Sequence, residues 1–566
     1  MENALTAVCS RWMGRLTHPL GAALLLLLVC FGLHRSALSG GWQFDDGAHL
    51  LMAAKYAPWQ YFFVPEVMLE STPAHITPWN VFFYEMGLPF FGLNPVGHYV
   101  HLLLVLWGVA YATFFLLGEW LPKPYALFGA VLFLAMPPVA GVAQMLMVGH
   151  YVYGLLFTVL ALLAFNRAVL TGQTRYALLT AGLYALACLC KELYVPLPAV
   201  LLFLPVKTWQ LRLRSLLGVA VVAVAYVGFR WWVLGGIGGY GKRESIASIP
   251  LLPYLQQLQQ ALFGSKYPYW LSAGFGLAWL GVMVRGGWRY GGVLGVILGV
   301  LLLPMLAVAG TGFDGGSIRY VFVFAWVVAI GWVVAARLLT KQEPSWWLSL
   351  IGVAVLFALA LAQNAVPAKD LTSGQVNRWI TTHIAQPKHV LFTEAQGGFS
   401  KEVAEAQVLL GGSAPEVVTT RAGIAQLAED TVIFAYQTAC QCIQPLAEGK
   451  AGLMQSWQQA AAAGQSQPLA VRMWVKKVWK NHGRWTGAVA WLMSPYQEGV
   501  YWVTLENPAM GMGLPPQGSS ALSVHDDALR IRIRYTSPQG WTVETPELTL
   551  PLAQGAEVRW EKPPQP

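Results

Sequence analysis

Apolar runs of about 20 residues recur along the sequence up to residue 365, and they constrain the fold more than any other feature. The runs lie near 17–37, 97–118, 125–147, 151–170, 176–191, 193–206, 215–235, 269–285, 291–310, 320–338 and 346–365. Charged residues make up 11% of the chain, whereas soluble proteins have about 25%. We therefore predict an α-helical polytopic membrane protein with about eleven transmembrane helices.

The first run also has features of a cleaved signal peptide, because Arg11 and Arg15 precede a leucine-rich segment. We interpret it as a retained helix. The later runs alternate across the membrane in a consistent way only when this first run is present.

Basic residues near the ends of the runs favour one orientation, with the N-terminus inside. Those in the resulting short cytoplasmic loops are Arg11, Arg15, Lys123, Arg167, Arg175, Lys207, Arg212, Arg214, Arg285, Arg289, Arg337 and Lys341. The net charge of +9 is thus explained by topology rather than by nucleic-acid binding. The run at 193–206 is the weakest span, because Pro196, Pro198 and Pro205 interrupt it. Without it, the orientation of everything that follows would invert.

An acidic pair follows the first run. Asp45 and Asp46 stand next to each other, and His49 lies one helical turn further on. Carboxylates at a membrane boundary are costly unless they face water, a cation or a reacting group. We expect Asp45 and Asp46 to be catalytic, with one carboxylate raising the pKa of the other so that it can act as a base. Two alternatives are a divalent cation held by Asp45, Asp46 and His49, and an ordinary solvated loop.

Further polar residues fall on the same outer side in this topology. Together with His49, they are His150, Lys191, Glu192, Arg230, Arg319 and Tyr320. Each has a structural explanation, such as an ion pair at a helix turn or an interfacial anchor. Taken together, they provide cations for a phosphorylated substrate, and we predict that they bind the phosphate of a donor.

The segment 38–96 is predicted to be a long outer loop. It is rich in Trp, Phe, Tyr and Pro, yet no part of it is long enough to span a membrane. Aromatic side chains favour the membrane interface, so we expect one or two interfacial helices here. Such helices would wall the side of a cavity that opens to lipid.

The composition changes after residue 365, and we predict a soluble outer domain over 366–566, following a transmembrane catalytic domain over 1–365. Short apolar strands are expected at 389–392 and 431–436, and helices around 402–410 and 455–463. A hairpin is expected from 528–535 to 541–544, followed by a strand at 547–550. The expected domain is a small α/β or β-sandwich structure, with the alternating arginines at 530–534 on a solvated sheet face.

The six cysteines indicate neither a disulfide framework nor a zinc site. Four of them lie in or near the apolar runs: Cys9, Cys30, Cys188 and Cys190. Cys440 and Cys442 are separated by one residue in the polar tail.

Several motifs in order resemble those of a known superfamily. They are Phe44-Asp45-Asp46 with His49, Trp59, Thr77-Pro78, Gly92-Leu93-Asn94-Pro95 with His98 and His101, Lys191-Glu192, and Arg319-Tyr320. This order resembles the GT-C superfamily of membrane glycosyltransferases, over about residues 15–340. Within it, the chain is similar to the branch of protein O-mannosyltransferases and bacterial enzymes that use polyprenyl-phosphate sugars.

The resemblance implies a lipid-linked sugar donor, a catalytic acid in the first outer loop, here Asp45 beside Asp46, and donor contacts from Lys191, Glu192, Arg319 and Tyr320. His150 stands where many relatives have an arginine. The tetratricopeptide repeats of the animal relatives are absent from the tail.

These observations predict an inverting glycosyltransferase in a bacterial inner membrane, with its site on the periplasmic side. It would move a sugar from a polyprenyl-phosphate carrier to a hydroxyl of an exported protein or glycan. No cofactor is implied apart from the divalent cation mentioned above. The alternative is a non-catalytic transporter of lipid-linked saccharides or an envelope assembly protein. A transporter would have ionisable residues near mid-span and repeated broken helices, and the sequence shows neither.

Overall fold

The computed structural model describes residues 15–203, 209–236, 251–264, 268–306, 315–340, 371–394, 399–506 and 509–563. The chain divides into two compact units that interleave along the sequence. Unit 1 comprises 1–40, 96–227 and 244–369, and unit 2 comprises 41–95, 228–243 and 370–566. The first outer loop and the C-terminal region therefore belong to the same unit.

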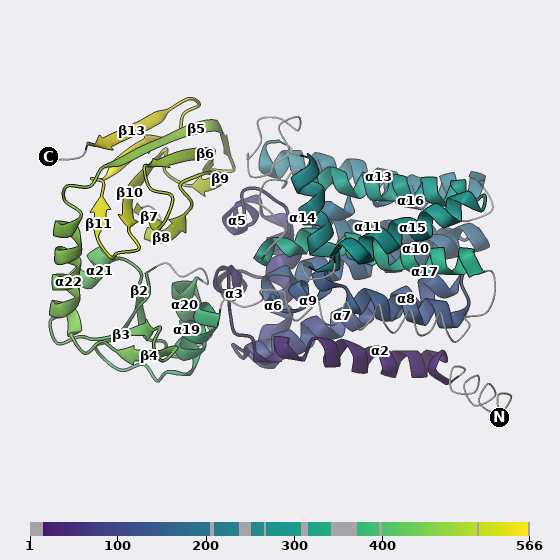
Figure 1. Ribbon diagram of the computed structural model, residues 1–566, viewed down its shortest axis with the longest axis horizontal. Helices are drawn as coiled ribbons and strands as arrows, with labels where there is room; N and C mark the ends of the chain where they lie inside the picture. Colours follow the sequence, from purple (N-terminus) through teal and green to yellow (C-terminus); the bar gives the residue numbers. More distant parts are fainter. Residues whose placement is uncertain are drawn as a thin grey trace. The chain divides into compact units, whose positions relative to one another are not determined.

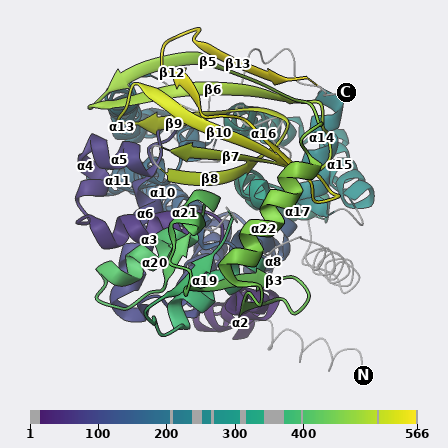
Figure 2. The same ribbon diagram turned by 90° about the vertical axis from the view of Figure 1, so that its left-hand side faces the viewer.

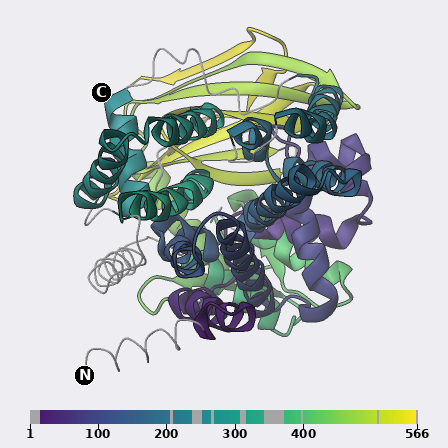
Figure 3. The same cartoon turned by 90° about the vertical axis from the view of Figure 1, so that its right-hand side faces the viewer.

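Unit 1 is helical (Figure 1). Its first helices are α2 (Pro19–Leu33), η1 (Arg35–Ser39), α7 (Pro95–Gly118), α8 (Lys123–Ala135), α9 (Pro137–Ala143), η2 (Leu146–Val148), α10 (Gly149–Thr171) and α11 (Thr174–Cys190). They are followed by η3 (Glu192–Tyr194), α12 (Leu197–Phe203), α13 (Trp209–Leu234), α14 (Leu251–Phe263), α15 (Pro268–Val284), α16 (Trp288–Leu306), η5 (Gly315–Val321) and α17 (Phe322–Thr340). Figure 3 shows many of these helices nearly end-on. The last residues of α13 belong to unit 2.

The predicted number of spans is not confirmed. Among the described residues, four helices are long and apolar enough to cross a membrane, or five if the bent pair α8 and α9 is one span. That pair bends by 60° at Met136, where Pro137 and Pro138 interrupt the helix. The other runs form shorter helices, such as α2 and α11. The run at 346–365 lies outside the described residues.

The first outer loop contains four α-helices in place of the one or two expected. These are α3 (Asp46–Lys55), α4 (Gln60–Phe63), α5 (Pro65–Ser71) and α6 (Pro78–Phe91). Pro65 and Pro78 occupy the first turns of α5 and α6, where the missing N–H costs nothing. Trp42, Tyr61, Phe83 and Tyr84 are buried in this segment, and the rings of Trp42 and Phe83 both lie against Tyr84.

The C-terminal region begins with an α/β layer. It consists of α19 (Leu371–Thr382), β1 (His389–Phe392), α20 (Ser400–Leu409), β2 (Glu416–Val418), α21 (Arg421–Gln426), β3 (Val432–Gln437), β4 (Cys442–Pro445) and α22 (Gly449–Ala463). The sheet order is β2-β1-β3-β4, with β1 parallel to both β2 and β3. The strands and helices expected from the sequence in this part are therefore confirmed.

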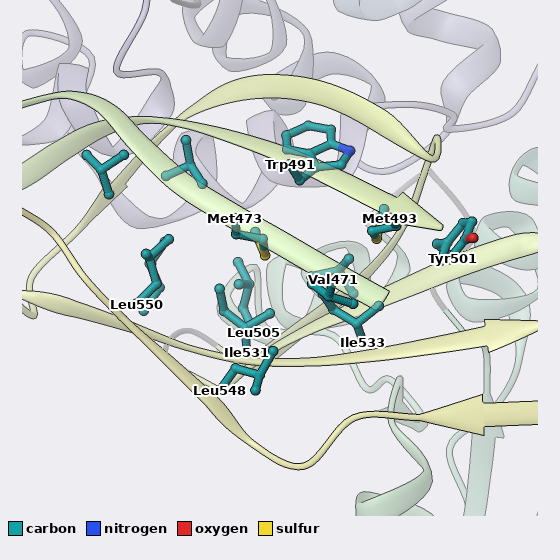
Figure 4. Close-up of a cluster of buried hydrophobic side chains, with 14 of the residues drawn as sticks. Val471, Met473, Trp491, Met493, Tyr501, Leu505, Ile531, Ile533, Leu548 and Leu550 are labelled. Atoms are coloured by element: carbon teal, nitrogen blue, oxygen red, sulfur yellow. The ribbon is translucent and has the colours of Figure 1, made fainter. Parts of the chain in front are cut away.

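Two antiparallel sheets complete the chain (Figure 2). Their strands are β5 (Leu469–Asn481), β6 (Arg484–Ser494), β7 (Val500–Glu506), β8 (Ala509–Leu514), β9 (Gln517–Val524), β10 (Ala528–Thr536), β11 (Thr542–Glu544), β12 (Leu548–Pro551) and β13 (Glu557–Lys562). The order is β13-β5-β6-β9 in one sheet and β11-β10-β7-β8 in the other, with β12 paired to β10. Alternate residues of both sheets share one apolar core, including Met473, Trp491, Leu505 and Ile531 (Figure 4). The region thus combines an α/β layer with a β-sandwich.

Two expectations for this region are wrong. Arg530 and Arg532 are solvent-exposed, but Arg534 is buried and its guanidinium donates to Glu394 of the α/β layer. Arg534 therefore links the layer to the sandwich instead of lying on a solvated face. The cysteine pair also differs, because Cys440 and Cys442 form a disulfide at the β3–β4 turn.

Candidate functional site

The segment Gly41–Lys55, called the acid loop below, carries the acidic pair. Phe44 has a φ of 52°, in the left-handed region that a bulky side chain rarely adopts. Such a conformation costs about 1–3 kcal/mol and persists only where surrounding contacts impose it. Asp45 follows as the residue before α3, and Asp46 is the first residue of that helix.

Asp46 is fully buried, and both of its carboxylate oxygens accept hydrogen bonds. Tyr84 Oη donates to Oδ1 at 2.5 Å, and the backbone N–H of Gln43 donates to Oδ2 at 2.7 Å. A carboxylate in the first turn is also stabilised by the positive end of the helix dipole. Asp46 therefore holds the start of α3 in place, with Tyr84 of α6 as its main side-chain partner.

Asp45 is solvent-exposed and makes no capping hydrogen bond to α3. The two adjacent acids, which are alike in the sequence, thus differ in the structure. Asp45 is the one that can reach a bound molecule, whereas Asp46 is enclosed by protein. The catalytic role of either residue stays a prediction.

His49 is buried one turn into α3, and its ring packs against Tyr84 with centroids 5.7 Å apart. Its Nε2 lies 2.8 Å from Asn80 Nδ2, so the amide donates and the imidazole carries its proton on Nδ1. Burial lowers the pKa of His49, while the nearby charge of Asp45 acts in the opposite direction. The side chain is therefore a neutral support of the acid loop.

The predicted metal ligands do not fit a three-ligand site. Asp46 uses both oxygens for protein hydrogen bonds, and His49 Nε2 is engaged by Asn80. Within the described ranges, no group of three or more His, Cys, Asp and Glu side chains is placed to hold a metal ion. A divalent cation at this position stays an untested prediction.

Arg230, at the end of α13, belongs to the same unit as the acid loop. Its Nη2 lies 3.4 Å from the carbonyl oxygen of Ala74, in the connection between α5 and α6. This cation is thus attached to the first outer loop, as well as ending a long apolar helix.

In unit 1, the structure brings four of the polar and aromatic residues together. Lys191, Glu192, His150 and Tyr151 are called the cation group below. Lys191 Nζ lies 3.5 Å from Glu192 Oε2 and 5.9 Å from the centre of the Tyr151 ring. The rings of His150 and Tyr151 are 4.7 Å apart. Tyr194 Oη donates to the Tyr151 carbonyl at 2.5 Å, which ties η3 to α10.

Arg319 and Tyr320 lie on η5, which packs on α9, α14 and α17. The Arg319 guanidinium lies 4.9 Å from the centre of the Tyr320 ring, and its Nη2 is 3.2 Å from the Tyr320 hydroxyl. Stacking and this hydrogen bond fix the direction of the guanidinium. The pair predicted from the sequence is thus a single preorganised cationic group.

Sequence reasoning missed Tyr84 and Asn80 as partners of Asp46 and His49. Both lie on α6, 31 to 38 positions further along the chain. The available signal was the helix start at Thr77-Pro78, which places Asn80 and Tyr84 four residues apart on one helix face.

Searches with the sequence gave no matching protein family and no matching curated protein. Comparison of the structure with solved structures gave several matches. One match is an oligosaccharyltransferase from Archaeoglobus fulgidus with a tethered acceptor peptide. It covers 72% of this chain and 64% of that one, with 13% identity and a TM-score of 0.41.

The oligosaccharyltransferase AglB from Archaeoglobus fulgidus, in complex with an inhibitory peptide and a dolichol-phosphate, matches with a TM-score of 0.40 and 13% identity, over 70% of this chain and 64% of that one. ArnT from Cupriavidus metallidurans matches with a TM-score of 0.41 and 11% identity, over 74% of this chain and 93% of that one. The chain thus spans less than two thirds of the archaeal enzyme. The structural neighbours are GT-C membrane glycosyltransferases, the superfamily whose motifs the sequence resembles.

Proposed function

We propose that this protein is an inverting glycosyltransferase that moves a sugar from a polyprenyl-phosphate carrier to a hydroxyl of an exported protein or glycan. The observation that carries the proposal is the difference in exposure and hydrogen bonding between the two acids of the pair. Asp45 is exposed at the start of α3, and the buried, hydrogen-bonded Asp46 fixes the backbone directly beside it. A base for an acceptor hydroxyl needs this combination of access and fixed position.

In the proposed reaction, the Asp45 carboxylate takes the proton of the acceptor hydroxyl. The acceptor oxygen attacks the anomeric carbon from the face opposite the phosphate, which inverts that centre. The bond between the anomeric carbon and the phosphate oxygen breaks, and the polyprenyl phosphate leaves with the electron pair. Cations that neutralise the leaving phosphate lower the barrier.

Arg319, Lys191 and Arg230 are the proposed phosphate ligands. Arg319 ranks first, because its guanidinium is oriented by Tyr320 and can present two parallel N–H groups to phosphate oxygens. Lys191 ranks second, since it shares its charge with Glu192. Arg230 ranks third, because it also anchors the end of α13 to the first outer loop. His150, Glu192 and Tyr320 would orient these cations.

We place the proposed site on the periplasmic side of a bacterial inner membrane. Two observations support this side: the basic residues in the loops assigned to the cytoplasm and the Cys440–Cys442 disulfide, since disulfides persist in oxidising compartments. The C-terminal region lies in the same compact unit as the acid loop, so both would face that compartment.

The test compares three substitutions in purified protein, with undecaprenyl-phosphate hexoses as donors and envelope protein or glycan fractions as acceptors. Asp45→Asn keeps the shape and removes the base, so transfer should fall by roughly two to four orders of magnitude at an unchanged Tm. Asp46→Asn places an amide N–H₂ against a donor and should lower both transfer and Tm. Asp527→Asn, an exposed acid of the sandwich, is the control and should change neither.

Near-parental transfer in Asp45→Asn would return the acidic pair to an ordinary solvated loop. The transporter or assembly interpretation would then be the better one. Its own signature would be binding of the lipid-linked sugar without any transfer product.

A further inference from the structure

Helices α19 and α20 of the C-terminal region lie against the acid loop, although they are more than 300 positions away in sequence. We propose that these helices are a working part of the catalytic site, with Asn377 as a positioning residue for Asp45. This inference rests on the proposed function, because it takes Asp45 to be the base. It assigns the C-terminal region a role in the reaction itself, beyond that of an attached domain.

The first contact is a buried hydrogen bond. Asn377, on α19, is fully buried, and its Nδ2 donates to the carbonyl oxygen of Trp42 at 2.9 Å. Trp42 is also fully buried, and its indole N–H donates to the carbonyl oxygen of Leu93 at 3.0 Å. Trp42, three residues before Asp45, is therefore held through both its backbone carbonyl and its side chain.

The second contact is a close approach of two glycine backbones. A Cβ added to Gly41 would lie 2.6 Å from the carbonyl oxygen of Gly374, whereas a Cβ added to Gly374 would lie 3.5 Å from the nitrogen of Gly41. The first distance is a severe overlap and the second is ordinary contact. Only a glycine at position 41 lets α19 come this close to the acid loop.

The third contact is the packing of α20 on α3. The buried side chains of α20 include Val403, Ala404 and Ala406, and those of α3 include Leu50 and Ala53. The helix that begins at Asp46 is therefore held by α20 as well as by α5 and α6.

Together these contacts fix every residue that leads to Asp45. Gly41 meets Gly374, Trp42 is held by Asn377, and the N–H of Gln43 is held by Asp46. Phe44 then takes its left-handed conformation, which only such surrounding contacts can maintain. Misplacing a catalytic group by about 1 Å can reduce a rate roughly a hundredfold, so loss of these contacts should reduce turnover.

The glycine pair provides a matched test on the full-length protein, with an undecaprenyl-phosphate hexose as the donor probe. Gly41→Ala should lower kcat roughly ten- to a hundredfold, with the KM for the donor within about twofold. Gly374→Ala alters the same contact, but its added Cβ has room. Its kcat should therefore stay near that of the parent. Asn377→Ala should lower kcat like Gly41→Ala. Asn166→Ala removes an equally buried amide, which donates to Glu119 in unit 1, and should leave kcat unchanged.

Hydrogen exchange provides a readout independent of transfer. The Gln43 amide is protected by Asp46, and Asn377→Ala should speed exchange within Gly41–Lys55 while the β-sandwich stays protected. Unchanged exchange there, or an unchanged kcat in both Gly41→Ala and Asn377→Ala, overturns the positioning role even if Asp45→Asn abolishes transfer. If Asp45→Asn retains transfer, the proposed function fails instead. If Gly41→Ala does not fold, the kcat and hydrogen exchange of Asn377→Ala alone test the positioning role.

Discussion

The acid loop and the cation group handle charge in opposite ways. In the acid loop, the buried carboxylate of Asp46 is satisfied by neutral donors, and a second carboxylate, that of Asp45, is left at the surface. In the cation group, Lys191 lies 3.5 Å from Glu192, and only 12% and 21% of the two side chains are exposed. One group thus presents a net charge to incoming molecules, whereas the other largely neutralises its own.

This difference indicates which cation would contribute most to the binding of a phosphate. A cation already paired with a carboxylate must give up part of that interaction to bind a new anion. The Arg319 guanidinium instead lies beside the Tyr320 ring and hydroxyl, which orient its planar N–H groups for a phosphate.

Arg319→Ala should reduce catalytic efficiency with an undecaprenyl-phosphate hexose roughly ten- to a hundredfold. A charge-assisted contact contributes about 1.5–3 kcal/mol, and about 1.4 kcal/mol corresponds to one decade. Arg319→Lys should recover part of the loss, since it keeps the charge without the planar fork. Lys191→Ala and Arg230→Ala should have smaller effects, in that order. Equal donor binding and turnover in all three alanine variants and the parent would show that the cations bind no phosphate.

Tyr84→Phe removes a hydroxyl that donates to the acid loop, and Tyr194→Phe removes one that donates to the cation group. Tyr84 donates to a buried carboxylate and Tyr194 to a backbone carbonyl. Hydrogen bonds to charged groups contribute about 1.5–3 kcal/mol and neutral ones about 0.5–1.5 kcal/mol. Thermal unfolding in detergent should therefore show the larger loss for Tyr84→Phe. The reverse order would contradict a charge-assisted hydrogen bond between Tyr84 and Asp46.

Stability should decrease in mild acid because of His49. Burial, opposed by Asp45, lowers the pKa of its imidazole from 6.5, so the unfolded chain takes up a proton more readily than the folded one. The contribution of neutral His49 to the free energy of unfolding is fully present above about pH 6.5. It is lost as the pH falls from there towards the lowered pKa of His49 in the folded protein. The slope for one group is at most about 1.4 kcal/mol per pH unit.

Unfolding curves between pH 5 and 8 would measure this effect. His49→Gln, which can still bond to Asn80, should flatten the dependence. His525→Gln removes an exposed histidine of the sandwich and should leave it as in the parent. Parallel curves for the parent and His49→Gln would rule out this origin of the acid sensitivity.

The sequence predicted local structure well where one period dominates. The alternation at Ala528–Tyr535 and the Ser-Pro-Gln-Gly turn predicted the hairpin of β10 and β11, which pair from Arg534 to Thr536. The same alternation could not show that Arg534 is buried, because its partner Glu394 lies 140 positions earlier. Periodicity identifies a face of a strand but not what covers that face.

The candidate site divides in the same way. Asp45, Asp46 and His49 could be selected from their spacing alone. Their different roles depend on Tyr84, Asn80 and Asn377, which come from other helices. Hydrogen bonds across such separations leave no periodic trace in a single sequence, and the short disulfide of Cys440 and Cys442 likewise had no recognisable pattern.

The hydrogen bond between Asn377 and Trp42 can form only late in the synthesis of the chain. The two residues are 335 positions apart, and translation proceeds at about 5–20 residues per second. Asn377 is therefore synthesised roughly 17–67 s after Trp42. During this interval, the transmembrane helices of unit 1 can insert while Asp45 is not yet held in place. If the proposed function holds, a nascent or truncated chain would turn over lipid-linked sugars more slowly, and full turnover would begin only once the C-terminal region is made.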